Sequence, residues 1–274
     1  MNPSDWLTTT DAAALAGVAA STIKRWADQG ALAFSRTAGG HRRFERAAVE
    51  QLLRDQAVPS AQDDSALDRW VQCLVDGRRY EVEAQLLSAR GRLGRWCEVG
   101  DEVAEALREI GRRWESGAIS IADEHVASDC LARALARVGD MMPTGGGGPR
   151  CLLACAGDDE HSLGLTLAEP CLREHGWTPV WLGRRTPVGE LARLVAEGRA
   201  ELVAMTASPA HHDADALAAL AAEVGSHCKK AKVALVLGGS GPWPAAPAYG
   251  TRLSSLVAFS DYLTAFPTRR SSRR

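Results

Sequence analysis

The residues with the clearest potential for chemistry lie in the segment GDDEHSLG, residues 157–164. It follows the apolar run 151–156 and precedes helix-forming residues, so an acidic cluster and His161 gather where a predicted strand turns into a helix. A neutral imidazole is a common metal ligand, and strand ends are common ligand sites in α/β proteins. A lone histidine in such a loop is more often structural or solvated, so a binding role for His161 needs support from elsewhere in the chain.

A second group of residues, in the segment RTAGGHRRFER at 36–46, could contact phosphates. The glycine pair allows a hairpin tip, and four arginines around it accompany one glutamate. Such clusters contact the phosphates of nucleic acids, although an ordinary solvated loop can have the same composition. The basic residues of this group are Arg36, His41, Arg42, Arg43 and Arg46.

A third group lies in the segment WESGAISIADEH, residues 114–125. Ser120 followed by Asp123 forms a capping box, which predicts that a helix begins there and carries Glu124 and His125 on its first turns. Taken alone, Trp114 would be a core residue of a helix and His125 a surface residue.

The bulk composition limits the class of protein. A length of 274 residues exceeds one ordinary core, and 46% hydrophobic with 24% charged residues indicates a globular protein of several domains. The net charge of −2 excludes a generally basic nucleic-acid coat protein but allows a local basic surface. Seven cysteines without paired metal spacing fit a reducing compartment. Because no apolar run has membrane-spanning length and no signal peptide is evident, we expect a cytoplasmic protein without a membrane partner.

The pattern along the chain predicts a multidomain fold. Residues 1–57 have two short helices separated by a tight turn and then a hairpin, and residues 65–143 have the pattern of a four-helix bundle. Residues 149–266 alternate strands and helices, which predicts an α/β Rossmann-like domain with helices on both faces of a parallel sheet. The predicted strands are 151–156, 178–182, 202–206 and 233–237, and the predicted helices are 163–174, 187–197 and 213–224. The basic tail, 267–274, is expected to be a solvated end, with a weak DNA-binding role as the alternative.

The segments TTTDAAALAGVAASTIKRWADQGAL and RTAGGHRRF together resemble the winged helix-turn-helix DNA-binding domain of MerR-type transcription regulators over residues 5–54. This resemblance implies an all-α domain with a small β wing, whose partner is operator double-stranded DNA. Its expected DNA-binding residues are Ser21, Thr22, Lys24 and Arg25 on the recognition helix, and Arg36, His41, Arg42 and Arg43 at the wing. Trp26, Leu32 and Phe44 are expected in the core. The cysteines that metal-sensing members use are absent, so metal sensing is not expected.

The opening segment contains Asp159, His161 and Gly164 in the form Asp-x-His-x-x-Gly, which resembles the cobalamin-binding motif of methionine synthase, the mutases and related photoreceptors. The resemblance implies that His161 is the lower axial ligand of cobalt and that Asp159 holds its other ring nitrogen. Gly164 would let the backbone pass close to the bulky cofactor. His211 and His212 are expected to be solvated.

Two further segments, MTAS at 205–208 and LGGSG at 237–241, resemble the parts of such domains that receive the nucleotide tail of cobalamin. The C-terminal domain is therefore expected to be a Rossmann-like cobalamin-binding domain. Its expected cofactor-binding residues are Asp159, His161, Ser162, Gly164, Thr206, Ser208, Gly238 and Gly239.

Trp114, followed ten residues later by Glu124 and His125, resembles the bundle of the light-responsive CarH and LitR repressors. There the tryptophan covers the upper face of adenosylcobalamin, and the glutamate and histidine line the adenosyl pocket. The resemblance now covers almost the whole chain and implies a repressor, not an enzyme, with adenosylcobalamin as chromophore. It implies a homotetramer bound to operator DNA in the dark, which becomes dimers or monomers after light breaks the cobalt–carbon bond.

Glu115 departs from this family pattern. In the best-known repressors the residue after the tryptophan is a histidine that ligates cobalt after photolysis, and here that position is a glutamate. Glu115 stays in the expected cofactor-binding set, but a bis-histidine light product through this position is not expected. Two alternatives stay open: a cobalamin-dependent regulator with altered or no photochemistry, and a corrinoid carrier protein of a methyltransferase or mutase.

Overall fold

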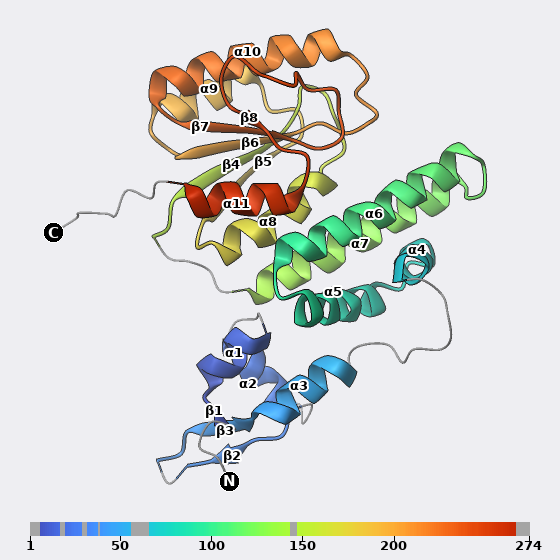
Figure 1. Ribbon diagram of the computed structural model, residues 1–274, viewed down its shortest axis with the longest axis vertical. Helices are drawn as coiled ribbons and strands as arrows, with labels where there is room; N and C mark the ends of the chain where they lie inside the picture. Colours follow the sequence, from blue (N-terminus) through green and yellow to red (C-terminus); the bar gives the residue numbers. More distant parts are fainter. Residues whose placement is uncertain are drawn as a thin grey trace, which may run out of the picture. The chain divides into compact units, whose positions relative to one another are not determined.

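The computed structural model describes residues 6–16, 20–28, 32–37, 39–55, 66–142 and 147–266. The chain divides into two compact units, Met1–Pro143 and Thr144–Arg274. The first contains an N-terminal domain and a helical bundle, and the second contains a parallel sheet (Figure 1). The basic tail at 267–274 lies outside the described residues. Among the described helices, none is long and apolar enough to cross a membrane.

The N-terminal domain is the winged helix-turn-helix that the sequence predicts. Its elements are β1 (Trp6–Leu7), α1 (Thr9–Ala16), α2 (Ala20–Asp28), β2 (Ser35–Arg36), β3 (Arg42–Glu45) and α3 (Arg46–Asp55). The strands form an antiparallel sheet in the order β1-β3-β2, and the β2–β3 hairpin is the wing. Trp26, Leu32 and Phe44 are buried, which confirms their predicted place in the core.

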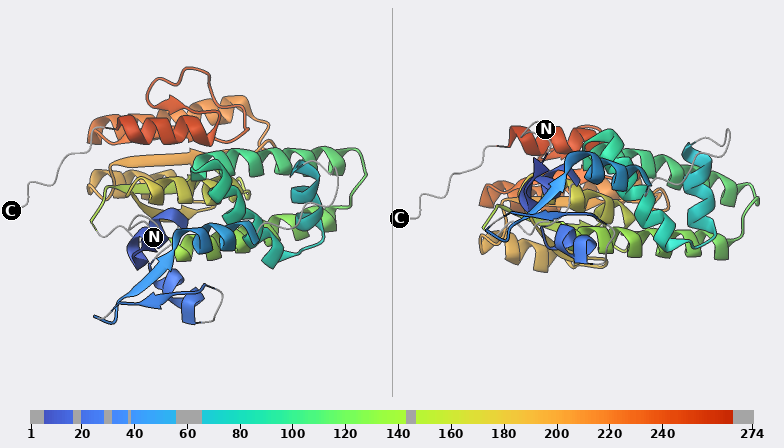
Figure 2. Two further views of the ribbon diagram at one scale, coloured as in Figure 1. Left: turned by 60° about the horizontal axis from the view of Figure 1, so that its bottom comes forward. Right: turned by 90° about the horizontal axis from the view of Figure 1, so that it is seen from below.

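The bundle consists of α4 (Ala66–Val75), α5 (Arg79–Leu93), α6 (Trp96–Glu115) and α7 (Ile121–Met141). Buried residues recur along one face of α6 at Val99, Val103, Ala106 and Ile110, the spacing of an amphipathic helix. Helices α6 and α7 run side by side in opposite directions (Figure 1, Figure 2). The predicted capping box begins α7, because Ser120 accepts from the Asp123 amide and Asp123 accepts from the Ser120 amide. It places Glu124 and His125 on the first turns of α7, as expected.

The second unit is the predicted α/β domain. Its elements are β4 (Arg150–Cys155), α8 (Leu163–Glu174), β5 (Thr178–Gly183), α9 (Val188–Ala196), β6 (Leu202–Thr206), α10 (Ala214–Ala231), β7 (Ala234–Gly238), β8 (Thr251–Arg252) and α11 (Leu256–Ala265). The strands are parallel in the order β5-β4-β6-β7-β8. Helices α9 and α10 cover one face of the sheet, and α8 and α11 cover the other (Figure 1).

The register of the central strands brings three loops together at one edge of the sheet. Cys155, the last residue of β4, lies opposite Thr206, the last residue of β6, and Thr206 lies opposite Gly238, the last residue of β7. The pairing continues one step further, since the Ala156 amide donates to the Thr206 carbonyl at 2.8 Å. The loops after β4, β6 and β7 therefore start side by side, at the edge where ligands of parallel sheets bind.

Candidate functional site

His161 lies in the loop after β4, and its ring is oriented by Asp159. The Nδ1 atom is 2.8 Å from Asp159 Oδ1. The Asp159 side chain is 1% exposed, whereas the His161 side chain is 60% exposed. A carboxylate can only accept from a ring N–H, so in a neutral imidazole Nδ1 carries the proton and Nε2 keeps its lone pair. Within the described part of the chain no hydrogen bond occupies Nε2, so this atom is suited to bind a metal.

Asp159 is itself held by the loop after β6. The Ser208 amide donates to Asp159 Oδ2 at 2.5 Å, the Ser208 hydroxyl donates to Oδ1 at 3.1 Å, and the His161 amide donates to Oδ1 at 2.9 Å. Burial alone would raise the pKa of Asp159, but these hydrogen bonds from Ser208 and His161 outweigh it and lower the pKa. The carboxylate is therefore ionised at neutral pH, and residues of two separate predicted motifs form one cluster.

Close packing explains two of the predicted glycines. A Cβ atom at Gly164 would lie 2.6 Å from Thr206 Oγ1, and one at Gly239 would lie 2.3 Å from the Ala207 carbonyl oxygen. Gly239 also has a positive φ of 83°. Gly164 thus lets the start of α8 approach Thr206, a contact inside the protein that the sequence reasoning did not include. At Gly238 the nearest atom would be at an ordinary 3.8 Å, so this position has room beside it.

The two residues that flank His161, Glu160 and Ser162, make contacts that fix the loop. Ser162 starts α8 through its carbonyl, which accepts from the Leu165 amide at 3.0 Å, while its side chain makes no capping hydrogen bond. Glu160 forms ion pairs with Arg184 at 3.3 Å and with Arg185, both from the loop after β5. Sequence reasoning missed these two arginines, although they follow a predicted strand and belong to the same edge of the sheet.

Two other residues near the site differ from expectation or were missed. His211 was expected to be solvated, which is wrong: its side chain is 16% exposed and Nδ1 lies 3.6 Å from Asp158 Oδ1. A turn closed by the His211 amide and the Ser208 carbonyl brings it there. His212 is exposed, as expected. Trp243 is buried and donates from Nε1 to the Gly238 carbonyl at 2.8 Å, which supports the glycine loop; no motif marks it.

The bundle residues of the predicted site lie on both sides of the α6–α7 turn. Trp114 and Glu115 are the last two residues of α6, and both are exposed, Trp114 by 46%. Glu124 accepts from the Ser128 hydroxyl at 2.7 Å and lies 2.7 Å from His125 Nδ1. The structure therefore brings Glu124 and His125 into contact and leaves the indole of Trp114 accessible. From its place in the sequence alone, Trp114 would be a core residue of the helix. Its exposure does not fit that interpretation, because large aromatic side chains in a core are buried.

The predicted DNA-binding residues fall on α2 and the wing. Ser21 and Lys24 are exposed on α2, and Arg36 and His41 are exposed on the wing. Arg43 is half-buried on β3, opposite Ser35. Thr22 and Arg25 also lie on α2, but their side chains are outside what the structure describes.

Arg42 has a different environment from the other basic residues of the wing. Its side chain is 20% exposed, donates from Nη2 to Asp28 at 2.5 Å and from Nη1 to the Lys24 carbonyl at 3.1 Å. The guanidinium also lies 4.7 Å from the ring centroid of Phe34. Arg42 therefore joins the wing to α2, a contact within the domain that its prediction as a DNA-binding residue did not include.

Comparison with known proteins agrees with this organisation. Residues 6–57 match a family described as helix-turn-helix domain, and residues 66–138 match one described as B12 binding domain. The fold and the matched domains define a helix-turn-helix protein with a B12 binding domain. The chain is 30% identical over 233 residues to the HTH-type transcriptional repressor CarH of Myxococcus xanthus, covering 71% of this chain and 76% of that protein. The chain belongs to the family of HTH-type transcriptional repressors that includes CarH.

Other relatives share parts of the chain. The repressor CarA of Myxococcus xanthus is 26% identical over 223 residues, covering 71% of this chain and 74% of CarA. The dimethylamine corrinoid protein of Methanosarcina barkeri is 22% identical over 147 residues, covering 53% of this chain and 69% of that protein. The solved monomethylamine corrinoid protein of the same organism has a TM-score of 0.56 at 13% identity, covering 72% of this chain and 97% of that one. This last similarity shows a shared fold.

Proposed function

We propose that this protein is a light-responsive transcriptional repressor that uses adenosylcobalamin as its chromophore. Membership of the CarH family supports a cobalamin-binding transcriptional repressor. The single observation that carries the cofactor assignment is the His161–Asp159–Ser208 cluster, in which a buried carboxylate fixes one ring nitrogen of an exposed histidine and leaves the other for a metal.

The proposed cofactor-binding residues lie in the sheet domain and in the bundle. His161 would bind cobalt through Nε2, and Asp159 would keep its Nδ1 protonated. Trp114, with Glu115, Glu124 and His125 near it in sequence, would cover the upper face and the adenosyl group. Thr206, Ser208, Gly238 and Gly239 would receive the nucleotide tail, and Ser162 and Gly164 belong to the same proposed cofactor-binding set. When bound, the cofactor supplies a cobalt–carbon bond that visible light breaks.

The N-terminal domain would bind operator DNA through α2 and the wing. In the proposed dark state several copies of the chain, four in our expectation, bind together, so that each DNA-binding domain raises the effective concentration of the others. Dissociation to dimers or monomers after illumination would then release the operator without any change within one DNA-binding domain.

Glu115 makes the light product of this protein different from that of the best-known repressors. Its side chain is exposed on the last turn of α6, where the proposed upper face lies, and a carboxylate offers no imidazole nitrogen. We therefore expect no bis-histidine absorption spectrum after illumination. Glu115 is also compatible with the alternative function, a cobalamin-dependent regulator with altered photochemistry.

Titration with adenosylcobalamin in darkness tests the cofactor proposal, followed by sedimentation before and after green light. The native protein should bind one cofactor per chain and sediment as a larger particle in the dark than after light. His161→Ala should bind adenosylcobalamin more weakly, because a protein ligand to the metal is lost, whereas the matched control His212→Ala should bind it as the native protein does. Absence of cobalamin binding by the native protein would refute the proposal.

A second candidate is a corrinoid carrier, which the similarity to the dimethylamine corrinoid protein favours. A carrier has no use for a helix-turn-helix domain, and residues 6–57 match one. A DNA-binding experiment with competing DNA sequences distinguishes the two candidates. A repressor should bind selected DNA sequences only when residues 1–57 are present, and a carrier should show no sequence preference.

A further inference from the structure

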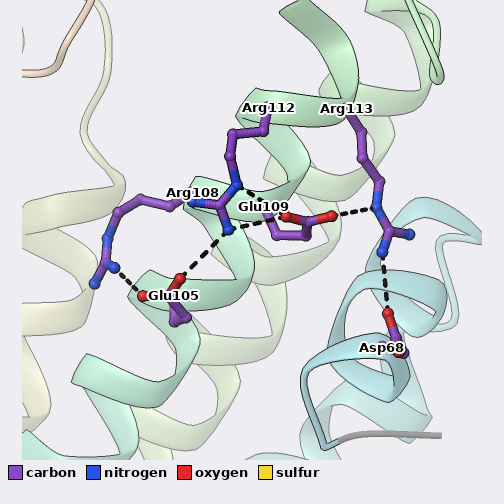
Figure 3. Close-up of polar contacts among 6 residues, drawn as sticks. All are labelled: Asp68, Glu105, Arg108, Glu109, Arg112 and Arg113. Carbon is purple, nitrogen blue, oxygen red and sulfur yellow. Dashed lines mark hydrogen bonds and ion pairs between the residues drawn. The ribbon is translucent and has the colours of Figure 1, made fainter. Parts of the chain in front are cut away.

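Arg113 lies in the last turn of α6, one residue before Trp114, and joins two helices of the bundle. Its Nε donates to Glu109 Oε1 at 2.7 Å, and its Nη2 donates to Asp68 Oδ1 at 3.0 Å (Figure 3). Asp68 lies in the first turn of α4. The side chains of Arg113 and Asp68 are 33% and 49% exposed, so this contact is a partly exposed ion pair at the surface of the bundle.

Arg113 and Glu109 keep their charges over the physiological range of pH. The hydrogen bond to Glu109, followed by that to Asp68, raises the pKa of Arg113. The hydrogen bonds from Arg113 and Arg112 lower the pKa of Glu109. Arg112 donates from Nε to Glu109 Oε2 at 2.9 Å, so Glu109 is fixed from both sides (Figure 3). Arg113 is thus held in one geometry between its own helix and α4.

The backbone of the same residue closes the turn that follows Trp114. The Arg113 carbonyl accepts from the Ser116 hydroxyl at 3.0 Å, the Ala118 amide at 2.8 Å and the Ile119 amide at 3.2 Å. Ser120, which caps α7, comes next. The turn that leads to the start of α7 therefore closes on the backbone of Arg113, the residue whose side chain binds Asp68.

Among the described elements, α4 follows α3 in the chain, with residues 56–65 between them in the sequence. We propose that Asp68 and Arg113 form a positioning link between the α6–α7 turn, which carries Trp114, and helix α4. A structural change at this turn would then also affect α4, the described helix that follows the DNA-binding domain in sequence. Arg113 acts through its neighbour Trp114 and needs no contact with the cofactor. This inference rests on the proposed function in one respect, namely that the event is binding of adenosylcobalamin.

Hydrogen exchange of the full-length protein without cofactor tests the link itself. Asp68→Asn removes the charge at nearly constant size, and Asp68→Glu keeps the charge. The matched control is Asp129→Asn, which breaks the exposed Arg133–Asp129 pair of 2.7 Å on α7. In Asp68→Asn the amides of residues 116–119 should exchange about threefold faster than in the control, the scale of one weak ion pair, and Asp68→Glu should restore slow exchange. Unchanged exchange at 116–119, or an equal rise in every bundle helix, overturns the link.

A second arm adds adenosylcobalamin in darkness and tests the coupling. In the native protein and in Asp129→Asn, the cofactor should slow exchange both at 114–120 and along α4. In Asp68→Asn it should still slow exchange at 114–120, but the effect on α4 should fall at least about threefold. An undiminished effect on α4 overturns the coupling. Absence of cofactor absorption in the native protein contradicts the proposed function instead, and the arm without cofactor then decides whether the link exists.

Discussion

The residue on which the assignment depends most is Asp159, a buried carboxylate whose four hydrogen bonds come from two residues, His161 and Ser208. An exposed histidine without such a partner would choose between two tautomers and several ring orientations. Asp159 removes that choice, because a carboxylate only accepts. The ring is therefore prepared for a metal before any cofactor arrives.

Replacing Asp159 by Asn tests this preparation. The amide has nearly the same shape but lacks the charge and can present a donor to Nδ1, which would turn the ring to the wrong tautomer. We expect cobalamin to bind about 10- to 100-fold more weakly, the range found when a residue behind a metal-binding histidine is changed. Absorbance titration measures the affinity, with His212→Ala as control. Equal affinity of Asp159→Asn and the native protein would contradict the role of Asp159.

The pH dependence of stability gives a second test of the same residue. Because the folded state lowers the pKa of Asp159, its contribution to the free energy of unfolding is present above the unfolded pKa of about 3.9. That contribution is lost as the pH falls through the lower pKa of the folded state. Urea unfolding between about pH 5 and 2 should therefore show a steeper loss of stability for the native protein than for Asp159→Asn. Parallel curves would mean that Asp159 is not stabilised in its ionised form.

At the scale of elements, Arg42 joins the wing to helix α2 by hydrogen bonds. Its role is therefore structural, whereas the neighbouring Arg43 is expected to contact DNA phosphate. Arg43→Gln should reduce the slope of log affinity for DNA against log salt by about one, because a phosphate contact is lost. Arg42→Gln should weaken DNA binding with an unchanged slope, and Asp28→Asn should have the same effect. Fluorescence anisotropy at several salt concentrations measures both. A reduced slope for Arg42→Gln would show that it contacts phosphate directly.

The approach of α8 to β6 depends on a position without a side chain. Gly164→Ala should destabilise the sheet unit by about 1–3 kcal/mol, as overpacked sites do, since its Cβ would lie 2.6 Å from Thr206 Oγ1. Adding Thr206→Ala should recover part of the loss. Gly189→Ala, on α9 with no atom within 4 Å of the added group, is the control and should leave stability unchanged or raise it by up to about 1 kcal/mol. Equal stability of the Gly164 and Gly189 variants would refute this packing.

The success of sequence-based prediction also differs by element. Strand 202–206 and helix 163–174 were predicted with the bounds of β6 and α8, because their apolar runs end at clear turn residues. Strand β8 has two residues and α11 is apolar on most sides. Neither therefore has a regular spacing of apolar and polar residues, and both were missed. The motif residues Asp159, His161 and Ser208 could be found by resemblance. The pairing of Arg42 with Asp28 and the placement of His211 could not, because both depend on contacts between separate segments.

At the scale of the whole molecule, the chain joins a DNA-binding domain, a bundle with an accessible tryptophan and a sheet domain with a prepared histidine. Each of these parts is defined by its own residues and contacts. The helix-turn-helix and B12 binding matches, and the similarity to CarH, are found in the same chain. We propose that the chain binds adenosylcobalamin through residues of the bundle and of the sheet domain, and that several assembled chains bind DNA together. The Asp68–Arg113 link would carry the event within each bundle.

The most direct test of this account is the DNA affinity of the adenosylcobalamin-loaded protein in darkness and after green light. The probe is a duplex enriched from a random library by the loaded dark protein, and electrophoretic mobility reports the complex. We predict a slowly migrating complex in the dark that is lost after illumination, and no such complex for His161→Ala under either condition. A complex that survives illumination unchanged, with the cofactor demonstrably photolysed, would contradict the proposal of a light-responsive repressor.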